Sequence, residues 1–131
     1  MWRLDTAFLL LSVICLLAGV CLGTHMVIVQ NFQLLPVHAH IYLLGWTSLA
    51  LFGVVYRLYP RAAHLTLARF HFWLAAPGAI TFPIGIYLAL MHQNPLLAIV
   101  SAFCWLASVV TFLAIVVMLV FSPQLHDTRD W

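Results

Sequence analysis

Fixed charge is almost absent from this sequence. It has no lysine and no glutamate, so its charged residues are five arginines and three aspartates among 131 residues, while 66% of the chain is hydrophobic. Soluble domains carry about 25% charged residues, which excludes a chain whose whole surface faces water. With so little basic charge, we also expect no nucleic-acid partner. The composition predicts an integral membrane protein surrounded by lipid.

Cysteine is also scarce. The three cysteines, Cys15, Cys21 and Cys104, each lie within an apolar run. An odd number of thiols in hydrocarbon argues against a disulfide framework. We expect these side chains to pack as small hydrophobic residues.

Long apolar runs, in contrast, fill most of the chain. Four of them are long enough to cross the hydrocarbon layer of a bilayer, which takes about 20 residues. They cover about residues 7–29, 36–59, 70–91 and 96–121. The connections between them are short, so consecutive helices should be antiparallel neighbours. The sequence therefore predicts an all-α membrane protein in which residues 1–131 form a single domain, an up-down bundle of four transmembrane helices.

The arginines indicate an orientation in the membrane. All five would lie on one side of the predicted topology: Arg3, Arg57, Arg61, Arg69 and Arg129. Loops that carry positive charge stay in the cytoplasm, so we expect both termini and the middle connection there. The expected location is the bacterial inner (cytoplasmic) membrane, which the chain would cross as a multi-pass protein.

Histidine is unusually frequent for so apolar a chain, with seven copies. Four of them would gather at the non-cytoplasmic ends of the spans: His25, His38, His40 and His92. Polar groups inside membrane spans are functional-site candidates, although water or lipid headgroups also satisfy an imidazole at the interface. The absence of any acidic partner at this end favours a functional role for the four as a group.

The other three histidines lie on the cytoplasmic side. We expect His64 and His126 to be solvated, since they fall in a connection and in the C-terminal tail. His71 opens the third span and is a weaker candidate for a functional or metal-binding role.

The spacing of His38 and His40 separates their roles. Pro36 suits the first position of a helix, so we expect regular helix through both histidines. Residues two apart in such a helix point about 200° away from each other. One histidine should therefore face its own bundle, while the other faces lipid, a neighbouring chain or a second site. A subunit interface is the favoured position for His40.

Two glycines stand one heptad deeper than outer histidines. Gly45 follows His38 by seven residues, and Gly85 precedes His92 by the same number. A flat macrocycle needs a missing side chain beneath its axial ligand, although membrane helix contacts are also rich in small residues. The predicted cofactor-binding residues are His38, His92, His25, His40, Gly45 and Gly85.

The chemistry of imidazole suits several metals. A neutral imidazole binds haem iron through one nitrogen while an acceptor orients the other N–H. Copper or zinc held by the same four histidines, in a metal-handling or oxidase-assembly protein, is the second interpretation, because nitrogen-rich sites suit these metals too. The third interpretation is an accessory subunit without a cofactor.

The second span carries a longer pattern, PVHAHIYLLGWTSLALFGVVYRLYP. It resembles helix two of the catalytic subunit of haem-copper oxidases and nitric oxide reductases, and short four-span proteins grouped with that subunit. In that family, a histidine just inside this helix is an axial ligand of the low-spin haem, and by position it corresponds to His38. The resemblance implies b-type haem near the periplasmic face, with a role in electron transfer alongside a respiratory partner, or in haem or gas sensing.

The departures from the family pattern limit what the resemblance implies. His40 stands where the family commonly has asparagine, and the chain lacks the paired histidines and tyrosine of the oxygen-reducing or nitric-oxide-reducing centre. We therefore do not expect an enzyme. The twelve helices of the family form three arcs of four, and closed symmetric homo-oligomers are common among small chains. A homotrimer of this chain would imitate that arrangement.

Overall fold

The structure, a computed structural model, describes residues 3–122 and is helical over most of this range. Four helical stretches in it are long and apolar enough to span a membrane: Leu4–Val29, Leu35–Leu58, Thr66–His92 and Leu96–Phe121. These bounds agree with the predicted spans and confirm the all-α class. Two residues discussed above, His126 and Arg129, lie outside the described range.

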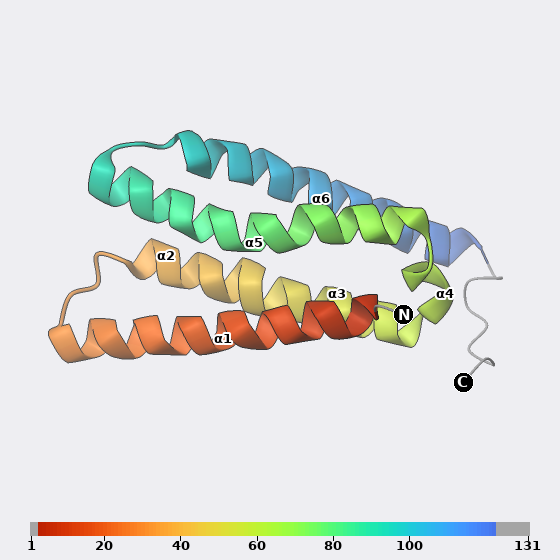
Figure 1. The fold of residues 1–131 in the computed structure, drawn as a ribbon, viewed down its shortest axis with the longest axis horizontal. Helices are drawn as coiled ribbons and strands as arrows, with labels where there is room; N and C mark the ends of the chain where they lie inside the picture. The colour runs from red at the N-terminus through yellow and green to blue at the C-terminus, as the bar shows by residue number, and fades with distance from the viewer. Residues whose placement is uncertain (1–2, 123–131) are drawn as a thin grey trace.

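The helices form two antiparallel hairpins (Figure 1). In the first hairpin, α1 (Leu4–Val29) packs along a second span made of α2 (Leu35–His40), η1 (Ile41–Ser48) and α3 (Leu49–Leu58). A short helix, α4 (Pro60–Ala63), leads to the second hairpin, in which α5 (Thr66–His92) packs along α6 (Leu96–Phe121). We call the end that holds Arg3, Arg57 and Arg69 the arginine end, and the end that holds His25, His38, His40 and His92 the histidine end.

The second span is not a uniform α-helix. Ile41–Ser48 is π-helical, with backbone hydrogen bonds between residues five apart. The Ser48 hydroxyl follows the same spacing, since it donates to the Leu43 carbonyl over 2.7 Å. Regular α-helix therefore holds through His38 and His40, as expected, but stops immediately after them. Short π-helical turns are rare and occur frequently at functional sites.

Small residues let α1 approach the second span closely. A Cβ added to Gly19 would lie 2.6 Å from the Tyr42 ring, and one added to Gly23 would lie 2.8 Å from the His38 ring. Such contacts are too short for carbon atoms, so the Tyr42 or His38 ring would have to shift to admit a larger residue. Gly19 and Gly23 therefore act as a helix-contact pair of the kind common in membranes.

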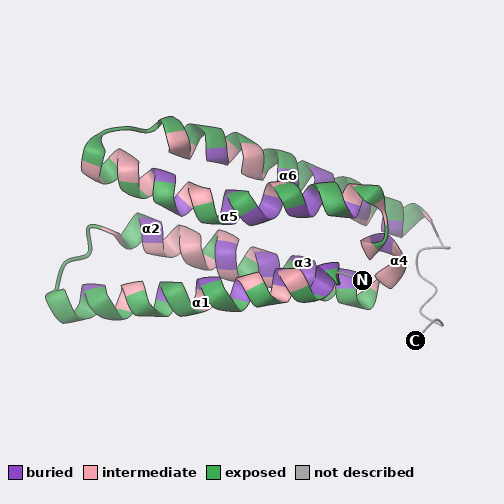
Figure 2. Cartoon of the chain, in the orientation of Figure 1, coloured by how far each residue is buried: buried purple, intermediate pink, exposed green. Residues whose placement is uncertain are grey.

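Buried residues concentrate at the arginine end (Figure 2). The core there draws on every span, including Phe8 of α1, Phe52 of α3, Phe72 of α5 and Ile115 of α6. Toward the histidine end α1 and α5 are lined by exposed apolar side chains, among them Ile14 and Ile84. The bundle is thus tightly packed in one half and more open in the other.

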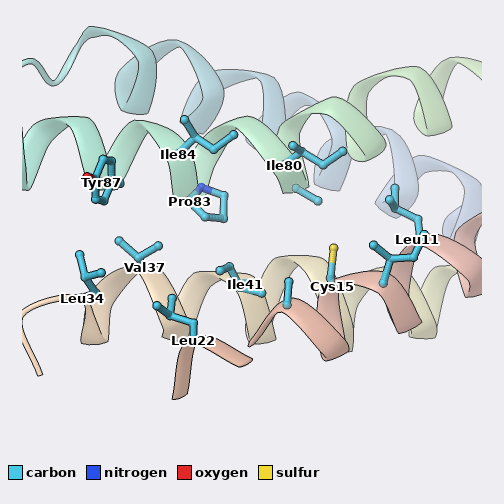
Figure 3. A pocket seen from close by; sticks show the side chains of 13 residues that line it. Leu11, Cys15, Leu22, Leu34, Val37, Ile41, Ile80, Pro83, Ile84 and Tyr87 are labelled. Atoms are coloured by element: carbon cyan, nitrogen blue, oxygen red, sulfur yellow. The ribbon is translucent and has the colours of Figure 1, made fainter. Parts of the chain in front are cut away.

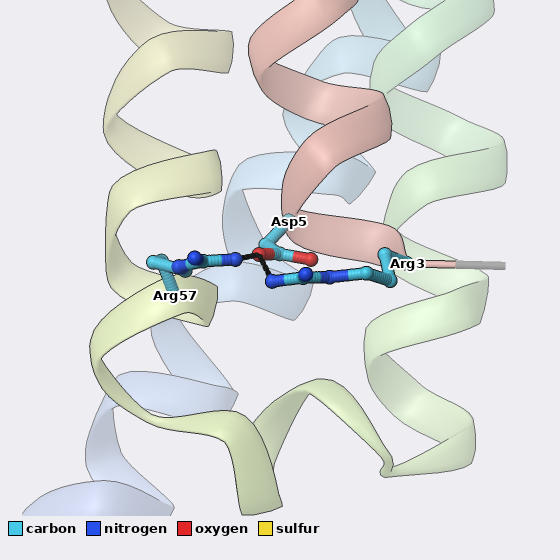
Figure 4. Close-up of polar contacts among 3 residues, drawn as sticks. All are labelled: Arg3, Asp5 and Arg57. Atoms are coloured by element: carbon cyan, nitrogen blue, oxygen red, sulfur yellow. Dashed lines mark hydrogen bonds and ion pairs between the residues drawn. The ribbon is translucent and has the colours of Figure 1, made fainter. Parts of the chain in front are cut away.

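A buried carboxylate ties the ends of two helices together at the arginine end (Figure 4). Asp5, in the first turn of α1, accepts from Arg57 of α3 over 2.9 Å and from Arg3 over 3.2 Å. The Asp5 side chain is 11% exposed, whereas those of Arg3 and Arg57 are at least half exposed. Because both arginines face solvent, each pair contributes at most about 1 kcal/mol to stability.

Gly85 controls how closely α5 and α6 approach. A Cβ added there would meet the Ala98 backbone of α6, with Ala98 Cα at 2.6 Å and the Leu97 carbonyl carbon at 2.8 Å. Backbone atoms cannot turn aside as a flexible side chain can. The two helices would have to separate to admit even one methyl group.

We predict that Gly85→Ala lowers the free energy of unfolding by about 1–3 kcal/mol, the usual cost of overpacking. Gly78→Ala is the matched control in the same helix, since its Cβ would lie 3.3 Å from a Trp105 ring atom and 3.8 Å from the nearest backbone atoms. Unfolding in mixed micelles, followed by circular dichroism, measures both variants. Equal stability of the two would show that α5 and α6 do not depend on this contact.

Candidate functional site

His38 faces α1 at the histidine end. It is half-buried, its ring lies against Gly23, and its centroid is 4.8 Å from that of Tyr42. Its Nδ1 is buried and has no hydrogen-bond partner. A buried nitrogen without a partner costs about 1–3 kcal/mol, so this position is not explained by stability alone.

His40 lies on the opposite flank of α2 and faces α5. Its ring centroid is 5.1 Å from that of Phe82. The prediction that the two histidines diverge is therefore confirmed. The prediction that His40 points away from its own bundle is wrong, because the second span lies between α1 and α5 and both of its flanks contact helices of the same chain.

The surroundings of His40 also fix which nitrogen carries hydrogen. Its Nδ1 lies 2.8 Å from the Pro36 carbonyl oxygen. A carbonyl only accepts hydrogen bonds, so Nδ1 is the donor and Nε2 of the neutral ring keeps its lone pair. This is the arrangement of a metal-binding histidine, in which an oxygen acceptor behind the ring orients the ligand.

The remaining outer histidines do not converge on this pair. His25 and His92 are both exposed, and the nearest aromatic ring to His92 is Tyr87 of its own helix, at 6.2 Å. Across residues 3–122, no three side chains of His, Cys, Asp or Glu come together in a group fit to hold a metal ion.

The two glycines predicted to seat a macrocycle are occupied by neighbours. A Cβ on Gly45 would lie 2.8 Å from the Cys15 sulfur, and Gly85 faces the Ala98 backbone. His38 and Gly45 do share the side of the span that faces α1, as the heptad count predicts. The space beside both glycines is filled, and they serve helix contact in this structure.

The most enclosed histidine is His71, which the sequence ranked below the outer four. It is fully buried, and its Nδ1 is 2.8 Å from the hydroxyl oxygen of Tyr56. Rings from the other spans surround it, with centroids at 5.3 Å for Phe8, 4.6 Å for Phe52 and 5.3 Å for Phe112. Its Nε2 is buried without a partner.

A sequence signal for this contact exists. Tyr56 lies near the end of span two and His71 near the start of span three, so antiparallel packing brings them to a similar level. Aromatic side chains from the other spans enclose the His71 ring. The pair therefore acts as a polar contact within the core and offers no open space for a cofactor.

We predict that Tyr56→Phe lowers the free energy of unfolding by about 1–3 kcal/mol, because it leaves both nitrogens of a buried imidazole without a partner. Tyr42→Phe, which removes a hydroxyl from a half-buried tyrosine at the other end of the bundle, is the control. Unfolding in mixed micelles compares the two. A similar cost for both variants would mean that the hydrogen bond to His71 contributes nothing specific.

An apolar cavity of about 540 Å³ lies in the open half of the bundle (Figure 3). Helices α1 and α5 form its walls, and α2 and η1 form its floor. Its lining includes Ala18, Leu22, Val37, Ile41, Pro83 and Tyr87. No histidine is among the described residues that line it. We call this cavity the slot.

Comparisons with known proteins add no relative. No protein-family model, no curated protein and no solved structure matches this chain. The resemblance of residues 36–60 to helix two of the haem-copper oxidase subunit therefore stays a prediction.

Proposed function

We propose that this chain is a b-type haem-binding protein of the bacterial inner membrane, with both termini in the cytoplasm and its histidine end facing the periplasm. Its role would be electron transfer with a respiratory partner, or haem or gas sensing. The observation that carries the proposal is the hydrogen bond from His40 Nδ1 to the Pro36 carbonyl, which leaves Nε2 ready to bind iron. Bound haem would supply an iron that changes between ferric and ferrous states.

His40 is favoured over His38 as the first ligand. The resemblance assigns the ligand to His38, but that ring lies against Gly23 of α1 with its Nδ1 enclosed. His40 is half-buried beside Phe82 and has its tautomer set by an oxygen acceptor. His38 and His40 together mark the end of the chain where the haem would lie.

A haem with two imidazole ligands does not fit within one chain. The slot has no histidine in its lining, and His38, His40 and His92 pack against different rings, those of Tyr42, Phe82 and Tyr87. The second ligand would therefore come from another copy of the chain, which supports a homo-oligomer. A trimer is the favoured form, because three four-span chains would make a closed ring.

Spectroscopy tests haem binding and the ligand. Protein purified after expression with ample haem should show a Soret band. His40→Ala should weaken haem retention by at least the about 10–100-fold that follows loss of groups behind a metal ligand. His64→Ala, which removes an exposed histidine at the arginine end, should keep the band.

A wild-type protein without the band, or with bound copper or zinc instead, refutes haem binding. A band that survives in His40→Ala refutes the ligand assignment.

Native mass spectrometry in detergent tests the oligomer separately. We predict a trimer for the wild-type protein, with haem released when the trimer is dissociated by a harsher detergent. Haem retained by monomers would mean that a single chain holds both ligands. A monomer under all mild conditions would rule out a shared site.

A further inference from the structure

The slot has about the length of a lipid chain in one leaflet. Along α1 it runs from Leu11 to Leu22, or about 16 Å, and along α5 from Ala79 to Tyr87, or about 12 Å, at 1.5 Å per residue. Half of a bilayer's hydrocarbon layer is about 15 Å thick. On α5 the slot runs from the middle of the helix toward the histidine end, and on α1 it spans the middle of the helix.

The rims of the slot face lipid. Ile14 on α1 is 54% exposed, and Ile80 and Ile84 on α5 are 46% and 48% exposed. Small side chains at Cys15, Ala18 and Ala79 create the hollow between these rims. A hydrocarbon chain can enter sideways from the membrane and fill a space whose walls present only apolar groups.

The outer end of the slot selects against a charged headgroup. The chain has no arginine, lysine, aspartate or glutamate between residues 6 and 56 or between residues 70 and 122. Phosphate headgroups are commonly held by Arg or Lys, and neither residue is available here. Polar side chains near this end include Tyr87, whose ring lines the slot, and His92, whose ring centroid is 6.2 Å from that of Tyr87. A phenol hydroxyl and an imidazole N–H can each donate to a carbonyl oxygen.

We propose that the slot binds a lipid with one long apolar chain and an uncharged, hydrogen-bonding head, which is the chemistry of an isoprenoid quinone. The chain would lie between α1 and α5, and the ring carbonyl would lie within reach of Tyr87 and His92. This site is separate from the proposed haem ligand His40, which is not in its lining. The proposed quinone site therefore does not depend on whether the protein binds haem.

Native mass spectrometry of lipids retained from nanodiscs tests the proposal. Nanodiscs would contain ubiquinone-8, phosphatidylethanolamine and phosphatidylglycerol. Ala18→Phe fills the slot from an exposed position on α1, and Ala114→Phe, at an exposed position on α6, is the matched control. We expect ubiquinone-8 to be retained by the wild-type protein and by Ala114→Phe, and retention to fall about tenfold in Ala18→Phe. Circular dichroism of each variant verifies that it remains folded.

A second variant keeps the proposal open to contradiction if Ala18→Phe does not fold. Tyr87→Phe removes one polar group from the mouth without changing the shape of the slot, and it should weaken retention of ubiquinone-8 but not of either phospholipid. Retention of phospholipid that Ala18→Phe abolishes would identify the slot as an acyl-chain site and overturn the quinone. Equal ubiquinone-8 retention by all variants, or none by the wild type, would overturn the site itself.

Discussion

One hydrogen bond at the centre of the packed half joins the two hairpins. Tyr56 belongs to the first hairpin and His71 to the second, and their side chains meet at 2.8 Å among rings from α1, α3 and α6. In a membrane, helices gain no hydrophobic free energy by associating, so packing and hydrogen bonds decide how they pair. This contact fixes the level at which the hairpins face each other, and the positions of α2 against α5 at the other end follow from it.

The two halves of the bundle differ in how tightly they pack. Large aromatic side chains fill the arginine half, where the ion pairs of Asp5 also close the helix ends. In the histidine half, small residues leave a slot between α1 and α5 and let α1 approach the second span closely. A rigid half therefore supports an open half, which is a suitable arrangement for a binding site on a small scaffold.

The sequence predicted the spans well because each is determined by its own length and hydropathy. It also predicted that His38 and His40 diverge, since that depends only on the geometry of one regular helix. It did not predict which neighbours they meet, because this depends on the rotation of whole helices about their axes. His71 was underrated for the same reason: its importance lies in the rings that three other spans bring to it. Gly45 contacts Cys15 of α1, and counting residues along the second span alone does not reveal this contact.

The π-helical segment has a consequence for changes in chain length. Ile41–Ser48 holds its residues in wider turns than an α-helix, so it accommodates more residues over the same rise. Deleting one residue there would let the segment return to α-helix while α3 stays anchored in the packed half. Because the wider turns already hold an extra residue, His38 and His40 would keep facing α1 and α5, whereas the same deletion within regular α-helix would turn them by about 100° about the helix axis. The π-helical segment is thus the part of the second span that best tolerates the loss of one residue.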